Sequence, residues 1–450
     1  MLFLIELTGY SWTSLCVHGL MITLSTPLQE TFARMLFTQL KKIIPLASLA
    51  FSLSALPAIG QEESALTIRG FGTLGAARSS SADVEFIRDL SQPNGIKDGQ
   101  WSGRIDTLLG IQANWQLSPE LEVVGQVVSR YQYDTSRTPT LDAAYLKWVP
   151  DDRVSLRAGR IGADLMMLAD SRLVGYSYLT VRPSVDFFGP LFFSSFDGAD
   201  GSLTLPLGDG LLRSKLFAGE IQEKATGAPG IWDTSGSPVY GFIADYFTGP
   251  WQFRASSTSI RFSSNLNFTS LTDPLHAVAA LTGISSASVA ADALTAKDTD
   301  TRYHSLGTVY DNGPLQIQAA VNKITHETAT FQNSVAGYLL AGYRMNTITP
   351  YAGISAWKSN YKNLSTGLPD IPMFAPLNQG FQTLMNASGA DQTTYTLGAR
   401  WDVRSRIALK FQWDAVQGSS DSKFPYASAN TGSNWNGRTN VISATMDFIF

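Results

Sequence analysis

The chain has 450 residues, of which 16% are Asp, Glu, Lys or Arg, and its formal net charge is −4. Soluble proteins usually carry about a quarter of such residues, so a mean hydropathy near zero with so few charges argues against an ordinary soluble protein and against a helical membrane protein. The weak negative charge, without a Lys/Arg-rich run, argues against a nucleic-acid partner. Because the only cysteine is Cys16, we expect no disulfide framework, thiol nucleophile or thiolate metal site in the mature chain.

The first expected element is an export signal over residues 35–60. Lys41-Lys42 supplies a charged start, the apolar run that follows is short for a membrane span, and Ala58-Ile59-Gly60 offers small residues for cleavage. This order is typical of a cleaved secretory signal peptide, with Gln61 as the first mature residue. An uncleaved anchor is the alternative.

Residues 1–34 precede this signal awkwardly. We therefore interpret them as an upstream start-site artefact, with Met35 as the initiator, although Met1 is the other candidate. Residues 61–450 are expected to form a single domain.

From Leu66 onward, segments recur in which apolar and polar residues alternate, which is the period of a β-strand. The clearest examples are Leu66–Leu74; Ile105, Leu109, Ile111, Ala113 and Trp115 opposite Arg104, Asp106, Gln112 and Asn114; Tyr395, Leu397, Ala399, Trp401 and Val403 opposite Thr396, Arg400 and Asp402; and Ile407, Leu409, Phe411, Trp413 and Ala415 opposite Lys410, Gln412 and Asp414. Such alternation turns one face toward an apolar medium and the other toward water.

The last ten residues form the most informative of these segments. Phe448, Met446, Ala444 and Ile442 fall on one face, whereas Asp447, Thr445 and Ser443 fall on the other, and the chain ends on the aromatic Phe450. A strand that ends in a terminal aromatic resembles the closing strand of Gram-negative outer-membrane β-barrels, and this resemblance implies a barrel-assembly signal made of Phe450, Phe448 and Met446. An edge strand of a soluble sandwich is the alternative.

Short and long connections alternate along the chain. Tight turns with Gly, Pro, Asn, Asp or Ser are expected at 118–120, 150–153, 208–210, 249–250, 311–314, 346–350 and 404–405, and longer polar loops near 79–100, 134–140, 163–192, 225–237, 264–300, 329–334, 363–392 and 418–437. Seven turns and eight loops predict about sixteen strands. The fold class is therefore all-β, a transmembrane antiparallel β-barrel with short periplasmic turns and longer extracellular loops.

This pattern resembles the Gram-negative outer-membrane porin family. The resemblance covers nearly the whole mature chain and rests on Phe450, the export signal, the strand count and the long third loop after Arg157-Ala-Gly-Arg160. It implies a homotrimer in the outer membrane, in contact with lipid and lipopolysaccharide, that lets small hydrophilic solutes and ions diffuse passively. It also implies that the third loop, about residues 163–192, folds into the lumen. The acidic Pro-Glu-Phe-Gly-Gly-Asp segment of enteric porins is absent from that loop here.

A diffusion pore needs a polar lumen narrowed by fixed charges. By parity, the early strands are expected to aim a basic wall inward, made of Arg69, Arg104, Arg130, Lys147 and Arg157. The third loop would face it with Asp164, Asp170 and Asp186, together with Arg172 and Arg182, and opposed charges would create a transverse field. For any single arginine, an ordinary salt bridge is the alternative. Arg160 has the opposite parity and points inward only if Gly159 marks a bulge or the loop has already begun there.

Three other patterns suggest different chemistry. Gly70–Gly75 has the spacing of a dinucleotide-binding motif, but no helix is expected after it, so glycines packed in a strand explain it better. Asp197–Gly201 lacks the spacing of a calcium loop. His304 and His326 lie on neighbouring expected strands without a nucleophile motif beside them. We therefore expect no enzyme activity, no cofactor and no metal.

Two questions stay open at this stage. The loop over residues 264–300 is rich in Ala, Ser and Leu, and a short helix there would either latch onto a neighbouring subunit or cap the mouth. The function is expected to be a general diffusion porin. The alternatives are a solute-specific channel, with anions favoured by the basic wall, and a non-conducting structural or adhesive barrel.

Overall fold

The computed structural model describes residues 15–17, 20–22, 65–227, 230–423, 426–427 and 434–450. The chain divides into two units, residues 1–60 and 61–450. Within the first unit, the described residues are an antiparallel pair of short strands, β1 (Leu15–Val17) and β2 (Leu20–Ile22). The expected signal peptide over residues 35–60 lies outside the described residues.

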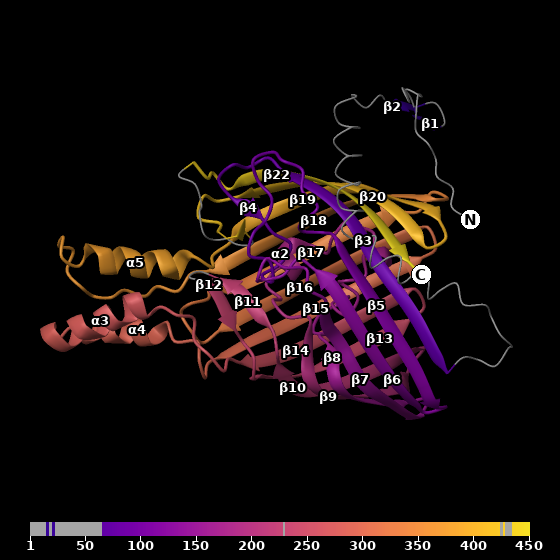
Figure 1. Ribbon diagram of the computed structural model, residues 1–450, viewed down its shortest axis with the longest axis horizontal. Coiled ribbons are helices and arrows are strands. Elements are labelled where there is room, and N and C mark those ends of the chain that lie inside the picture. The colour runs from indigo at the N-terminus through magenta and orange to yellow at the C-terminus, as the bar shows by residue number, and fades with distance from the viewer. Residues whose placement is uncertain (1–14, 18–19, 23–64, 228–229, 424–425, 428–433) are drawn as a thin grey trace. The chain divides into compact units, whose positions relative to one another are not determined.

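Sixteen antiparallel strands of the second unit close into one barrel, which confirms the predicted fold class (Figure 1). They are β3 (Leu66–Ser79), β5 (Leu108–Ser118), β6 (Leu121–Arg130), β7 (Thr140–Asp151), β8 (Val154–Gly162), β9 (Ser195–Leu207), β10 (Gly210–Ile221), β13 (Ser237–Thr248), β14 (Trp251–Arg261), β15 (Asp300–Asn312), β16 (Leu315–His326), β17 (Asn333–Tyr343), β18 (Ile348–Asn360), β19 (Asp391–Arg404), β20 (Ile407–Gly418) and β22 (Arg438–Ile449). The last strand pairs with the first, so the sheet has no free edge.

Residues 65–450 also form short pieces outside the barrel wall. Two small antiparallel sheets pair β11 (Lys224–Gly227) with β12 (Gly230–Asp233) and β4 (Glu85–Phe86) with β21 (Tyr426–Ala427). The third loop, residues 163–194, contains the 3-10 turn η1 (Gly175–Ser177) and the single-turn helix α2 (Val185–Phe188).

One predicted strand begins later than expected. β5 starts at Leu108, so Arg104, Ile105 and Asp106 belong to the first loop and not to the barrel wall. The reason is that this part of the loop has other partners: Ser102 forms an isolated bridge with Ala77. The alternation of residues 104–106 therefore continues the strand pattern in sequence but not in the structure.

The alternation of the strands sorts side chains to the two faces of the barrel. Each strand exposes at least one large apolar side chain on the outside, and examples in chain order are Ile68, Trp115, Val127, Leu146, Leu156, Leu203, Leu216, Phe242, Phe253, Leu306, Val321, Leu339, Ile354, Leu397, Phe411 and Ile442. The inward positions between them carry buried polar or charged groups, among them Thr73, Asp245, Arg254, Asn322, Ser355 and Lys410. This is the distribution of a barrel that meets lipid outside and a polar interior inside.

The C-terminal strand closes the barrel as its sequence predicts. Ser443, Thr445 and Asp447 are buried on the inner face, while Ile442 is exposed on the outer face. The backbone of Phe450 exchanges two 2.9 Å hydrogen bonds with Gly70 of β3.

Glycines on β3 make room for the terminal aromatics. A Cβ atom at Gly70 or Gly72 would overlap the ring of Phe450 or Phe448, respectively. The two rings stack on one another with centroids 6.4 Å apart. The glycine spacing of Gly70–Gly75 is therefore explained by a strand seam and not by a dinucleotide site, since the segment lies wholly within β3.

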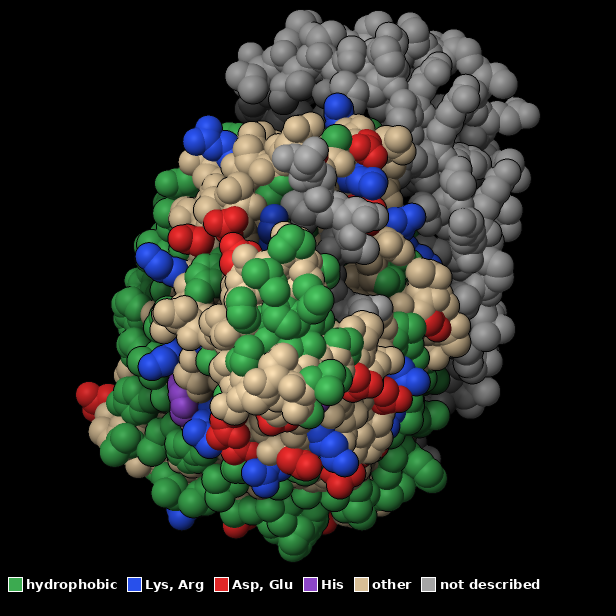
Figure 2. Space-filling model, turned by 90° about the vertical axis from the view of Figure 1, so that its left-hand side faces the viewer, with side chains coloured by type: hydrophobic (Ala, Val, Ile, Leu, Met, Phe, Trp, Pro, Cys, Tyr) green, Lys and Arg blue, Asp and Glu red, His purple; other side chains and the backbone are tan. Residues whose placement is uncertain are grey.

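Two loops at one end of the barrel carry the longer helices. The fifth loop, residues 262–299, holds α3 (Thr269–Thr282) and α4 (Ser285–Ala293), and the seventh, residues 361–390, holds α5 (Ala375–Asn386). The three helices share one apolar cluster, including Leu275, Ala290 and Phe381. They project away from the barrel end in Figure 1, and Figure 2 looks onto this end, where apolar side chains gather among charged ones. No helix of the described segments is long and apolar enough to span a membrane.

The seam between β22 and β3 yields a stability prediction. Phe448→Ala should lower the free energy of unfolding by about 1 kcal/mol, because the ring packs across the strand pair over Gly72. Phe411→Ala removes an outward aromatic that is 56% exposed and should cost less. Urea unfolding in detergent, followed by tryptophan fluorescence, measures both; equal losses would contradict a special role for the seam.

Candidate functional site

The third loop, residues 163–194, runs inside the barrel and is closed at its neck. It leaves β8 after Gly162 and returns to β9 at Ser195, and the Ala163 amide donates a 2.8 Å hydrogen bond to the Ser194 carbonyl. The resemblance to porins implies a third loop that folds into the lumen. Here, contacts with strands on opposite sides of the barrel wall hold the loop in place.

The first attachment of the loop is a buried charge cluster on β10 and β14. Asp164 accepts from Lys215 Nζ at 2.7 Å and is ion-paired with Arg254. Arg254 also donates to Asp245 at 2.7 Å and to the Met166 carbonyl at 3.0 Å. A buried carboxylate is thus paired with two cations, which is the condition under which buried charge is tolerated.

The second attachment lies on β19 and β20. Lys410 Nζ donates to the carbonyls of Gly175 at 2.6 Å and Thr180 at 2.9 Å, and it lies 3.2 Å from Asp447. Arg400 donates to the Tyr176 carbonyl at 2.7 Å. These cations satisfy carbonyls of a loop that has no strand partner of its own.

The third attachment is Arg182 of the loop itself, which is buried against the first loop, β20 and β22. Its guanidinium forms two hydrogen bonds with Asp106 of the first loop, at 2.9 and 2.7 Å. It also contacts Asp414 of β20 at 3.3 Å and Ser443 of β22 at 2.6 Å. One side chain therefore ties two loops to the seam of the barrel.

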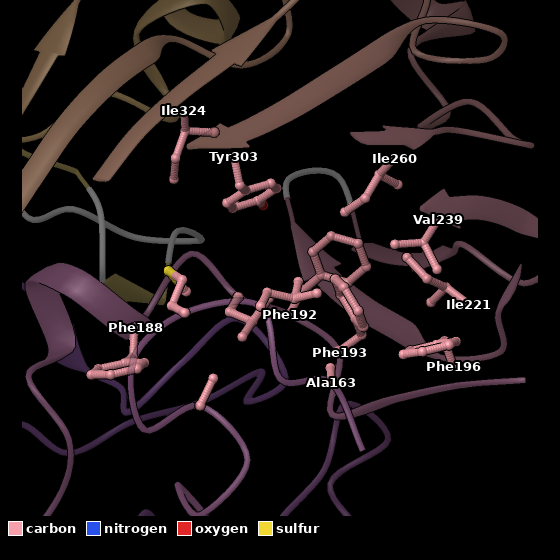
Figure 3. Close-up of a cluster of buried hydrophobic side chains, with 14 of the residues drawn as sticks. Ala163, Phe188, Phe192, Phe193, Phe196, Ile221, Val239, Ile260, Tyr303 and Ile324 are labelled. Carbon is pink, nitrogen blue, oxygen red and sulfur yellow. The ribbon is translucent and has the colours of Figure 1, made fainter. Parts of the chain in front are cut away.

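An apolar cluster fills the remaining space between the loop and the β9–β16 side of the wall. Phe187, Phe188, Phe192 and Phe193 come from the loop. Inward side chains of the strands meet them, including Ile221, Val239, Ile260, Tyr303 and Ile324 (Figure 3). Such an inner face is unusual for a water-filled barrel, and it places an apolar core inside this part of the lumen.

The expected basic wall is present in part and is balanced by carboxylates. In the strand register, Glu122, Lys147, Arg157 and Asp200 lie opposite one another across β6, β7, β8 and β9. Lys147 lies 3.7 Å from Glu122, and Arg157 Nε donates to both Asp200 oxygens at 3.0 and 3.1 Å. The row has no net charge.

The other arginines of the expected wall have different surroundings. Arg69 is exposed on the inner face of β3. Arg104, in the first loop, donates to the Gly95 carbonyl at 3.2 Å. Arg130 ends β6, where it donates to Ser91 at 2.8 Å and lies 3.8 Å from Glu223.

Loop residues Arg88, Asp89 and Arg172 gather near Arg130. Burial acts to raise the pKa of Asp89, but the nearby positive charges of Arg130, Arg172 and Arg88 outweigh it and lower that pKa. Arg172 itself donates to the Leu191 carbonyl at 3.3 Å. The acid that these three arginines surround is therefore Asp89 of the first loop, and not an acid of the third loop.

The acids of the third loop do not form one row opposite a basic wall. Asp164 pairs with Lys215 and Arg254, whereas Asp170 is exposed beside a cavity of about 60 Å³. Asp186 of α2 accepts from neutral Ser355 and Gln392, each at 2.6 Å. Arg160 pairs with Asp197 at 2.6 Å, and the register around Gly159 is unbroken.

The third loop is held by five residues that are not among the pore-lining residues predicted from the sequence: Lys215, Arg254, Arg400, Lys410 and Asp414. Arg400, Lys410 and Asp414 were recognised as inward by alternation, but nothing in the sequence paired them with a loop more than 200 residues away. His304 and His326 do not form a pair: His304 is exposed, whereas His326 bonds to Thr301 at 2.8 Å. The described residues contain no group of His, Cys, Asp and Glu arranged to hold a metal ion.

No protein-family model matches the chain, and no curated protein sequence is significantly similar to it. Solved structures are similar. OmpF of Salmonella typhi, in complex with daunomycin, superposes with a TM-score of 0.51 at 11% identity over 86% of this chain and 97% of that chain. An anion-selective porin from Comamonas acidovorans gives 0.49 at 12% identity over 86% and 99%. The channel DcaP of Acinetobacter baumannii gives 0.46 at 11% identity over 87% and 100%. The closed sixteen-stranded barrel and its superposition on OmpF show that the chain has a porin-like fold.

The buried position of Arg182 predicts a large loss on substitution. Arg182→Met should lower the free energy of unfolding by about 3–5 kcal/mol, because it leaves Asp106 buried without its cation. Combining it with Asp106→Asn should restore part of the loss. Urea titration of the detergent-purified variants measures the difference; a loss within about 0.5 kcal/mol would contradict the structural role of Arg182.

Asp186 gives a pH-dependent prediction. Burial raises the pKa of its carboxyl group above the ordinary value of 3.8, against the hydrogen bonds from Ser355 and Gln392 that lower it. The stability that the protonated carboxyl contributes is therefore full below the ordinary pKa and is lost as pH rises through the raised one. Asp186→Asn should lose less stability than the parent between pH 4 and 8. Parallel pH profiles of the unfolding midpoint would contradict this assignment.

Proposed function

We propose that this protein forms a passive channel through the Gram-negative outer membrane for small hydrophilic solutes and ions. The observation that carries the proposal is a closed sixteen-stranded barrel whose charged third loop is held inside it. The polar β3–β8 side of the interior, with Arg69 and the row from Glu122 to Asp200, offers hydrogen-bonding and charged groups to a hydrated solute.

A narrow, solute-selective channel is supported better than a wide general pore. The apolar cluster of the third loop takes up space on the β9–β16 side, where a wide pore would hold water. The balanced row on the opposite side offers carboxylates as well as cations, so it can interact with solutes of either charge. A purely basic wall would instead select for anions.

The cellular setting is part of the same proposal. We expect contact with lipid and lipopolysaccharide because the outer face of the barrel is apolar and exposed. Export by a cleaved signal peptide and assembly as a homotrimer follow from the resemblance to porins. The chain is proposed to be a channel and not an enzyme, since passive diffusion requires no catalytic group.

Selectivity measurements test the role of the charged row. Arg157→Ala leaves Asp200 without its cation, so the reversal potential across a KCl gradient should shift toward cation selectivity. The shift should grow as ionic strength falls below about 0.15 M, where screening reaches about 8 Å. Arg130→Ala should shift it in the same direction through Glu223.

The matched control removes a cation from the last loop region. Arg438→Ala, at the exposed start of β22, should leave the reversal potential nearly unchanged. Equal potentials for Arg157→Ala and the parent at low salt would show that this row does not line the conducting path. Absence of any conductance from the parent protein in planar bilayers would instead favour a non-conducting barrel and contradict the proposed function.

A further inference from the structure

A second cavity lies between the third loop and the β16–β20 part of the wall. It has a volume of about 70 Å³ and is separate from the row formed by Glu122, Lys147, Arg157 and Asp200. Its lining combines the carboxylates of Asp186 and Asp414 with the aromatic rings of Phe86, Tyr178, Phe188 and Tyr338. Carboxylates together with aromatic faces are the groups that recognise organic cations.

A single cation is among the described residues that line this cavity. It is Arg182, and two parallel hydrogen bonds commit its guanidinium to Asp106. Its contact with Asp414 is a longer one of 3.3 Å. Near the cavity, Lys410 faces the Tyr178 ring at 4.5 Å but is paired with Asp447.

Asp186 has no cation among its described hydrogen-bond partners. Its carboxyl group is 2% exposed and is held by Ser355 and Gln392, which are both neutral donors. A buried carboxylate is costly unless a positive charge accompanies it, and the raised pKa of Asp186 expresses that cost. Arg182 contacts Asp106 and Asp414, and Lys410 contacts Asp447, so Asp186 is the lining carboxylate that no described cation contacts.

The size of the cavity limits what can compensate the charge of Asp186. A single water needs roughly 10–15 Å³ of such space, so the cavity has room for about five waters or for a small organic molecule. The hydroxyl group of Thr394 also lines it and offers an oxygen acceptor for an N–H donor. An ammonium group carries three such donors as well as the missing charge.

We propose that this cavity binds a small primary ammonium ion, with Asp186 and Asp414 as its counter-charges and the aromatic rings around its alkyl part. The ammonium group replaces water between the two carboxylates, and the short alkyl chain lies against Phe188 and Tyr338. A role for this site in permeation rests on the proposed function, whereas binding of the ammonium ion does not.

Equilibrium binding tests the site directly. Isothermal titration of the detergent-purified full-length protein with ethylammonium chloride should show saturable binding, whereas ethanol and sodium acetate at the same concentrations should show none. Asp186→Asn and Asp414→Asn should each weaken binding about tenfold or more, because each loses a charge-assisted hydrogen bond. Glu327→Gln is the control: it removes an exposed carboxylate that lines neither cavity and should leave binding unchanged.

The outcomes separate the site from the channel. Saturable binding of ethylammonium that Asp186→Asn weakens supports the site even if bilayers show no conductance, a result that would contradict only the proposed function. Equal affinity of the parent and Asp186→Asn, or equal binding of ethanol, would overturn the site while conductance remained. If Asp186→Asn does not fold, the parent decides alone: its unfolding midpoint should rise with ethylammonium and not with sodium at equal ionic strength, and equal midpoints would overturn the proposal.

Discussion

The structure depends on the bonds that buried cations of the barrel wall make to the third loop. Residues 163–194 have no strand partner, so their carbonyls and carboxylates need donors from elsewhere. Arg254 and Lys215 supply them on one side, and Lys410 and Arg400 on the other. Each cation is itself held near a carboxylate of the wall or loop, so the interior can contain charge without leaving it unpaired.

This attachment divides the interior into regions of different character. On the β9–β16 side, the loop phenylalanines pack against inward isoleucines and valines as in a soluble core. On the β3–β8 side, polar and charged side chains face the interior, and the row from Glu122 to Asp200 is electrically balanced. In the proposed channel, a hydrated solute would pass along the second region and not through the first. The asymmetry is a physical reason for a narrow path, since the loop is fixed where it touches both regions.

The strand architecture was predictable because it follows from local alternation. Residues close together in the sequence were enough to predict the strands that end at Val403 and Ala415 and the closing strand with Phe448. The same holds for the order of turns and loops. The prediction failed at Arg104, because the first loop continues the alternating pattern while its backbone pairs elsewhere.

The partners of the charged residues could not be predicted in the same way. Alternation places Lys410 and Asp414 inside the barrel, but not against Gly175 or Arg182, because those contacts depend on the path of a loop across the lumen. Likewise, the phenylalanines after Asp186 gave no sign of whether they would meet lipid, another subunit or the inner wall. Asp200 lies on the neighbouring strand, and its neutralisation of Arg157 required the register between β8 and β9.

In the proposed channel a fixed third loop narrows the barrel, and single-channel recording in planar bilayers with polyethylene glycols of increasing size measures the width of the path. Polymers small enough to enter the pore lower its conductance. The loop contacts predict discrete conductance steps that only the smallest polymers reduce. With Lys410→Met, which frees the Gly175 and Thr180 carbonyls, somewhat larger polymers should also enter. Conductance that large polymers reduce equally in the parent and in Lys410→Met would contradict a fixed loop that narrows the barrel.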